Sequence, residues 1–320
     1  MFFFRSFYIK RFFTRLYQTF QNQGWSVIAK APTYLNVALP DFSVQYIIAS
    51  FQRKDEVYIR GIIPKASYVS LVVYDTFGLP QSYLYLDRTK SVSFTMKMGI
   101  DLPFPSTNEY AIILRIYQLQ EPFTYPSIFV NQKKIKPLLK STLYENSLKI
   151  SSEIIDILSR TLHLKISMSQ KFFKPVHSQT RGLFINPDAV YLVSSPNESR
   201  VMCVSGHLPP RNSSLCFVGF MACNLTTTET DDSIGWDDLD STYRIYVSHS
   251  IEKAIEKGYD PNQDKLLLWK DSNPSPILVY REVNLEHNGI FNLQSEKWQE
   301  AKRIMKSFYP EIEFFTESSC

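Results

Sequence analysis

Short runs of β-branched and aromatic residues alternate along this chain with turns rich in Gly, Pro, Asn and Ser. Such runs are typical of β-strands, because branched and aromatic side chains pack well on a pleated sheet. The runs form two series, at residues 46–50, 57–64 and 68–75 in the first half and at 191–195, 201–209 and 215–221 in the second. Each series therefore predicts strand, turn, strand, turn, strand.

The two series share turn positions and tyrosines. Tyr46, Gly61 and Pro64 recur with the same internal spacing as Tyr191, Gly206 and Pro209, and each trio follows a Pro-Asp pair, Pro40-Asp41 or Pro187-Asp188. A repeat constrains architecture, because each copy must form a similar unit that buries its apolar face. The sequence thus predicts a mainly β protein with a few helices, built from two tandem units related by internal duplication.

Each unit closes with an apolar strand that carries one arginine, Arg115 or Arg281, near its end. Because side chains alternate along a strand, each arginine shares a face with apolar neighbours. If that face is the core, each guanidinium needs a partner, since an unpaired buried charge is costly. The acids available in both copies are Asp41 and Asp188, so we expect structural ion pairs. A ligand-binding role for these residues is the alternative.

The pattern divides the chain into five segments. They are a basic aromatic N-terminal segment at 1–24, a first β unit at 25–140, a linker at 141–179, a second β unit at 180–290, and a C-terminal helix and tail at 291–320. Helical spacing of apolar residues predicts an amphipathic linker helix at 145–160. A second helix is predicted from Ser295, as N-cap, to Phe308 before Pro310. Its inward stripe would be Trp298, Ala301, Ile304, Met305 and Phe308.

The N-terminal segment mixes aromatic residues with arginine and lysine, and no acid precedes Asp41. Basic residues interrupt it too often for a transmembrane helix, which needs about 20 predominantly apolar residues. It also lacks the apolar region of a secretory signal. Three interpretations stay open: an organellar presequence, a helix on an anionic membrane, or a helix docked on the body or on a partner in an assembly. The residues expected at a membrane or partner contact are Phe2, Arg5, Lys10, Arg11, Phe12 and Arg15.

Composition is that of an ordinary globular protein, with 44% hydrophobic and 21% charged residues. The net charge of +4 is too mild to indicate nucleic acid, and no nucleic-acid-binding motif accompanies it, so no specific nucleic-acid partner is expected. Cys203, Cys216 and Cys223 lie in apolar runs without metal-ligand spacing, which predicts reduced core residues. We expect an intracellular location, cytosolic or membrane-peripheral. The sequence carries no signal for oligomeric state.

No strong catalytic constellation stands out. The five histidines are scattered, and neither a nucleophile elbow nor a phosphate-binding glycine loop is present. An acidic segment at 229–240 around Trp236 has two interpretations, a divalent-cation site or a solvated loop, and its spacing lacks a glycine-centred calcium loop. A basic stretch at 133–137 is interpreted as a solvated strip. The sequence therefore predicts neither a metal nor a cofactor, and leaves open whether the protein is an enzyme.

Several of these motifs resemble a known β-sandwich family. The matching segments are 61–64 with 74–75, 186–191, 243–247, 266–269 and 280–282. They are similar to the family catalogued as domain of unknown function twelve-fourteen, often found beside the related family twelve-fifty-four. The resemblance implies a jelly-roll-like antiparallel sandwich in each half, in families that occur in bacteria and in large DNA viruses of algae and have no assigned reaction. The chain departs from the family where Tyr74-Asp75 has no counterpart at Phe220-Met221.

Two functional hypotheses follow. The first is a non-catalytic structural or binding protein, a viral or membrane-peripheral component, whose N-terminal segment attaches it to lipid or to an assembly. The second is an enzyme or small-molecule binder that uses Arg115 or Arg281 to hold an anionic group in a pocket in or between the sandwiches.

Overall fold

Strands dominate the computed structural model, as predicted, and they form several mostly antiparallel sheets. The structure describes residues 14, 17, 24–29, 43–76, 80–85, 93–98, 108–136, 172–176, 186, 188–195, 201–211, 215–224, 230–273, 276–284 and 297–315. The predicted linker helix at 145–160 lies outside these residues. So do Asp41 and the six N-terminal contact residues, Phe2, Arg5, Lys10, Arg11, Phe12 and Arg15.

Internal contacts divide the chain into two units. The first comprises Met1–Ile157 and Gln179–Pro187, and the second comprises Leu158–Ser178 and Asp188–Cys320. Each unit contains two sheets whose apolar faces pack together.

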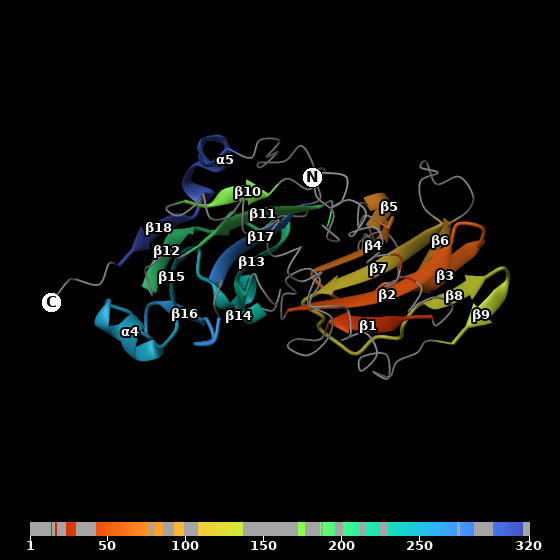
Figure 1. Cartoon of the computed structure of the whole chain (residues 1–320), viewed down its shortest axis with the longest axis horizontal. Coiled ribbons are helices and arrows are strands. Elements are labelled where there is room, and N and C mark those ends of the chain that lie inside the picture. The colour runs from red at the N-terminus through yellow and green to blue at the C-terminus, as the bar shows by residue number, and fades with distance from the viewer. Residues whose placement is uncertain are drawn as a thin grey trace. The chain divides into compact units, whose positions relative to one another are not determined.

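The first unit has a five-stranded and a four-stranded sheet, both antiparallel (Figure 1). In spatial order, the five-stranded sheet contains β1 (Ser26–Ala29), β2 (Val44–Gln52), β7 (Glu109–Tyr117), β4 (Tyr68–Tyr74) and β5 (Pro80–Tyr85), and the four-stranded sheet contains β6 (Ser93–Met98), β3 (Val57–Ile62), β8 (Ser127–Val130) and β9 (Lys133–Ile135). The core between them includes Ile47, Leu71 and Leu114 from one sheet and Ile59 and Ile128 from the other, all buried. Full burial of each such side chain contributes about 1.5–3 kcal/mol, so this interface is what joins the two sheets.

The second unit repeats this two-sheet plan. Its five-stranded sheet contains β10 (Lys174–Val176), β11 (Ala189–Ser194), β17 (Pro276–Asn284), β13 (Leu215–Asn224) and β14 (Thr230–Gly235), and its four-stranded sheet contains β16 (Lys265–Leu268), β15 (Thr242–Ser248), β12 (Val201–His207) and β18 (Glu311–Phe314). The pair β15 and β16 is parallel. The described helices are η3 (Trp236–Asp238), α4 (Ile251–Glu256), α5 (Trp298–Met305) and η4 (Lys306–Phe308).

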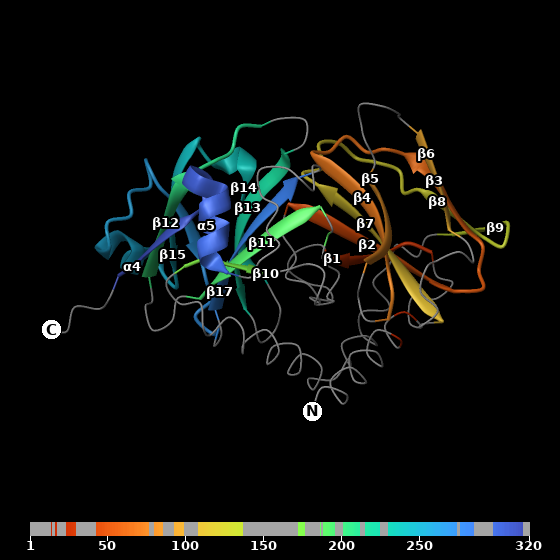
Figure 2. The same cartoon turned by 90° about the horizontal axis from the view of Figure 1, so that it is seen from above.

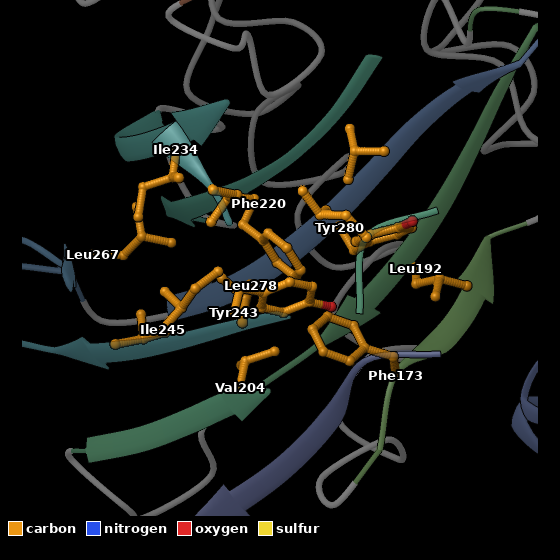
Figure 3. Packing of buried hydrophobic residues seen from close by; sticks show 14 of the residues in the cluster. Phe173, Leu192, Val204, Phe220, Ile234, Tyr243, Ile245, Leu267, Leu278 and Tyr280 are labelled. Atoms are coloured by element: carbon orange, nitrogen blue, oxygen red, sulfur yellow. The ribbon is translucent and has the colours of Figure 1, made fainter. Parts of the chain in front are cut away.

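Aromatic rings fill the interior of the second sandwich (Figure 3). The Phe220 ring lies between Tyr243 and Tyr280, with ring centroids 5.2 and 5.1 Å away. Phe173 packs against the same ring at 6.4 Å. Such tilted and edge-to-face pairs add about 0.5–1.5 kcal/mol each beyond burial.

Helix α5 packs on this core (Figure 2). Four of the five predicted stripe residues are confirmed: Ala301 and Met305 are buried in the core, and Ile304 and Phe308 pack against it. The fifth, Trp298, stacks on Phe172 with ring centroids 4.6 Å apart. The predicted start is wrong, because α5 begins at Trp298 and its N-cap is Lys297, which makes no side-chain capping bond. The adjacent β18 pairs with β12, so the second sandwich extends beyond the predicted boundary at residue 290.

Strand order corresponds between the two units. In the five-stranded sheets, the order β1, β2, β7, β4, β5 matches the order β10, β11, β17, β13, β14. In the four-stranded sheets, β3 lies between β6 and β8 as β12 lies between β15 and β18. The fourth strands differ, because β9 lies antiparallel beside β8 whereas β16 lies parallel beside β15. This correspondence is what a duplication would produce. The duplication itself and the jelly-roll class stay predictions.

The repeated glycines allow close approaches in both units. A Cβ on Gly61 would lie 2.9 Å from the Pro126 Cβ, and one on Gly206 would lie 2.6 Å from the Tyr243 hydroxyl. Both distances are shorter than real Cβ contacts, so a larger residue would displace its neighbour. The repeated prolines, Pro64 and Pro209, are buried just after β3 and β12. The prediction that Gly61 and Gly206 lie in turns is wrong, because they lie within β3 and β12, where their small size serves packing.

Candidate functional site

The two repeated arginines occupy the same place in their sheets. Arg115 on β7 lies across from Tyr46 on β2 and Ser70 on β4. Arg281 on β17 lies across from Tyr191 on β11 and from glycine 219 on β13. In both units the arginine therefore sits on a central strand beside the repeated tyrosine.

Both arginines face away from the sandwich interior, so the face that they share with their apolar neighbours is not the core between the two sheets. Leu114 and Ile116 point into the first core, so alternation turns Arg115 to the other face of the sheet. Tyr280 points into the second core, so Arg281 is likewise turned to the other face. This second face is also covered, because Arg115 is 1% exposed and Arg281 is 2% exposed.

Tyrosine rings pack against both guanidinium groups. The Arg115 guanidinium carbon lies 5.8 Å from the Tyr46 ring centroid and 5.2 Å from that of Tyr74. The Arg281 guanidinium carbon lies 5.1 Å from the Tyr191 centroid. Each such contact contributes about 0.5–2 kcal/mol, with the larger values at desolvated sites. The sequence analysis identified the arginines but missed the role of the tyrosines, although Tyr46 and Tyr191 are themselves part of the repeat.

The structure describes only one of the two predicted acid partners. Asp41 lies outside the described residues, whereas Asp188 is buried directly before β11, the strand that pairs with the arginine-bearing β17. The pairing of Arg281 with Asp188 stays a prediction, as does that of Arg115 with Asp41.

Strand register also corrects the comparison of Tyr74-Asp75 with the second unit. Tyr74 lies across from Ala111 on β7, and the matching position in the second unit, across from Ile277, is Cys223. Tyr74-Asp75 therefore corresponds to Cys223 and the buried asparagine 224. The predicted comparison with Phe220-Met221 is wrong by three residues.

Tyr17 anchors part of the N-terminal segment on the first unit. Its side chain is 1% exposed, and its hydroxyl donates a hydrogen bond of 2.7 Å to the carbonyl of Asp75. The Ser50 hydroxyl donates to the Tyr17 carbonyl. Burial, together with the nearby Asp75 and Tyr74, raises the pKa of Tyr17 well above its usual value. Sequence reasoning missed this anchor, because its hydrogen-bond partners lie 33 and 58 residues away.

The acidic segment holds a neighbouring turn and is not simply solvated. The Asp231 carboxylate accepts hydrogen bonds from the Asn273 side chain at 2.7 Å and from the Lys270 amide at 3.3 Å. The Asp232 carboxylate accepts one from the Leu268 amide at 3.0 Å, and burial raises its pKa. These carboxylates therefore join β14 to the turn that follows β16.

A surface arginine organises one end of the second sandwich. Arg244 pairs with Asp264 at 3.0 Å, and its guanidinium donates to the Tyr246 hydroxyl at 3.0 Å. Cys203 lies across from Tyr246 in the register. Burial raises the pKa of the Cys203 thiol to about 11, although Arg244 opposes the shift. A thiol with such a pKa is a poor nucleophile near neutral pH.

Within the described ranges, no group of three or more His, Cys, Asp or Glu side chains is placed to hold a metal ion. Of the helices in the part of the chain that the structure describes, none has the length and apolar character needed to span a membrane.

The comparisons with known proteins identify the fold. Neither a family model nor a curated protein matches the chain. An uncharacterised protein from Burkholderia cenocepacia is similar in structure, with a TM-score of 0.64 and 10% identity over 97% of this chain and 87% of the other. The VPA0106 protein from Vibrio parahaemolyticus aligns with a TM-score of 0.48 and 11% identity over 98% of this chain and 97% of the other. The first similarity supports the mainly β architecture, and the predicted resemblance to the two families of unknown function stays a prediction.

Proposed function

We propose that this chain is a non-catalytic structural or binding protein, a component of a membrane-peripheral or viral assembly. In this proposal each sandwich is a scaffold that presents a surface to other molecules. Arg115 and Arg281 stabilise the scaffold and do not bind a substrate.

The observation that carries the proposal is the burial of both guanidinium groups against tyrosine rings. A ligand-binding arginine must expose donors to its ligand, whereas Arg115 and Arg281 are 1% and 2% exposed and pack against Tyr46, Tyr74 and Tyr191. An arginine in the same place in both units is also more simply explained by a shared structural need than by two identical binding sites.

Contacts of Tyr17 support a docked N-terminal segment among the three interpretations of residues 1–24. A buried tyrosine whose hydroxyl and carbonyl both bond to the body adds to the fold, as a presequence that is removed would not. Membrane attachment through Phe2, Arg5, Lys10, Arg11, Phe12 and Arg15 is the competing proposal. Liposome co-sedimentation of the full chain and of its Arg5→Glu, Arg11→Glu variant distinguishes the two, because only the membrane proposal requires the variant to lose binding.

Native mass spectrometry of the purified full chain tests the scaffold proposal. We expect the mass of the polypeptide alone, and the same result for Arg115→Met and Arg281→Met. The exposed Arg303 supplies a matched control, Arg303→Met. A small anionic molecule that is retained by the unmodified chain and by the control but lost from Arg115→Met or Arg281→Met would overturn the proposal in favour of a ligand site.

A further inference from the structure

One face of the first sandwich combines exposed cations with exposed apolar groups. On β3 the inward residues alternate with Tyr58, Arg60 and Ile62, which point outward. Ile62 is 62% exposed, the highest fraction among the large apolar residues that the structure describes. The strand thus places a cation and a large aliphatic group side by side on its solvent face.

Two neighbouring strands extend this face. Phe129 on β8 lies across from Tyr58 on one side and from Lys134 on the other, so the three form a row across the sheet. The Arg60 guanidinium lies 5.7 Å from the Phe129 ring centroid. Lys134 is exposed, as are Lys133 beside it and Lys136 directly after β9. The basic stretch seen in the sequence is therefore one edge of a mixed cationic and apolar surface.

Among the described residues, the two acids next to this strand lie away from Arg60 and Ile62. Asp55 and Glu56 lie at the start of β3, at the opposite end from Ile62. The Glu56 carboxylate accepts a hydrogen bond of 2.7 Å from the Tyr58 hydroxyl, and Asp55 accepts one of 3.2 Å from Asn131. Within the described part of β3, the end that carries Arg60 and Ile62 is therefore the end away from these two acids.

We propose that this outer face, formed by Arg60, Ile62, Phe129 and Lys134 and called the lipid face below, docks on an anionic lipid surface. Its charge is complementary to acidic headgroups, and each cation near such a surface raises partitioning about fivefold. Ile62 adds an aliphatic group that gains by leaving water for the acyl boundary. This inference adds a specific surface to the proposed binding role and does not depend on residues 1–24.

Single-stranded nucleic acid is the competing occupant, since it also uses aromatic and basic sheet faces. Base stacking needs accessible ring faces. Here Arg60 packs against the Phe129 ring, and the Tyr58 hydroxyl is held by Glu56. The exposed Ile62 has no counterpart in phosphate recognition but suits lipid. The observations therefore favour a membrane.

Co-sedimentation of the full chain with vesicles tests the proposal. We expect binding to vesicles of phosphatidylcholine with phosphatidylserine and little binding to phosphatidylcholine alone. Arg60→Glu with Lys134→Glu should reduce binding at least about 25-fold, because two fivefold contributions are lost. Ile62→Ser should weaken binding to the vesicles, and the binding that remains should still depend on phosphatidylserine. The matched control is Lys297→Glu with Lys306→Glu, which makes the same charge change at exposed positions of the second unit.

The unfolding temperature is measured for every variant, and a loss of binding counts as evidence only when the variant is folded. Equal binding by the Arg60/Lys134 variant and the Lys297/Lys306 control would overturn the proposal, since net charge alone would then explain it. Binding to a single-stranded oligodeoxynucleotide that the Arg60/Lys134 variant loses, without vesicle binding by the unmodified chain, would also overturn it. Neither result would alter the mass measurement that tests the scaffold proposal.

Discussion

Replacement of Arg115 by methionine should destabilise the first unit substantially. Methionine fills a similar volume but loses the packing of the guanidinium against Tyr46 and Tyr74, about 0.5–2 kcal/mol for each ring. Removal of one partner of a buried charged interaction costs about 3–5 kcal/mol. Because these contributions overlap, we expect a loss of about 3 kcal/mol in the free energy of unfolding. For a unit of about 160 residues this lowers the Tm by about 6–12 °C.

Differential scanning calorimetry and urea unfolding measure this change. Arg60→Met is the matched control, because Arg60 also lies near an aromatic ring in the same unit but is exposed. We expect the control to lower the Tm by about 2 °C or less, since surface substitutions usually change stability by no more than about 0.5 kcal/mol. An unchanged Tm for Arg115→Met would refute the structural role of the arginine and favour a ligand role.

Three further predictions concern the second unit. Gly206→Ala should cost about 1–3 kcal/mol in urea unfolding, because its Cβ would meet the Tyr243 hydroxyl at 2.6 Å and its ring carbon Cζ at 3.0 Å. Tyr243→Phe should restore part of this loss, because the ring carbon remains. Alone it should cost nothing, since that buried hydroxyl has no hydrogen-bond partner among the described atoms. The raised pKa of Cys203 means that the neutral thiol is favoured in the folded state, so its contribution to stability is present below about pH 9 and is lost as pH rises through about 11. Cys203→Ala should reduce that alkaline loss, and an identical pH profile would contradict the assignment. Asp231→Ala should cost about 1–3 kcal/mol and speed amide hydrogen exchange in the turn near Asn273, and unchanged exchange there would show that the carboxylate does not hold the turn.

The strands could be predicted because the residue types that favour them are contiguous in the sequence. The run 68–75 is rich in β-branched and aromatic residues and forms β4, and the inward stripe of α5 follows from helical spacing. The start of α5 could not be located, because Ser295 looks like a better cap than Lys297, the residue found at that position. Capping preference is weak compared with packing of Ala301 and Met305 into the core.

The orientation of the arginines could not be predicted, for a different reason. All seven residues of β4 and eight of the nine residues of β7 are buried. When both faces of a strand are covered, alternation no longer distinguishes the sandwich interior from the other face. The roles of Tyr17 and Asp231 were missed because their partners are remote in sequence, 58 residues away for the Tyr17 hydroxyl and 42 for the Asp231 carboxylate.

A crystal structure of the full chain, with its two units superposed, tests the central claim most directly. The account predicts that β2, β4 and β7 superpose on β11, β13 and β17, and that Arg115 falls on Arg281 with Tyr46 on Tyr191. It also predicts that each guanidinium contacts protein groups alone. Strands that follow unrelated paths, or an anionic molecule bound to either guanidinium, would contradict it.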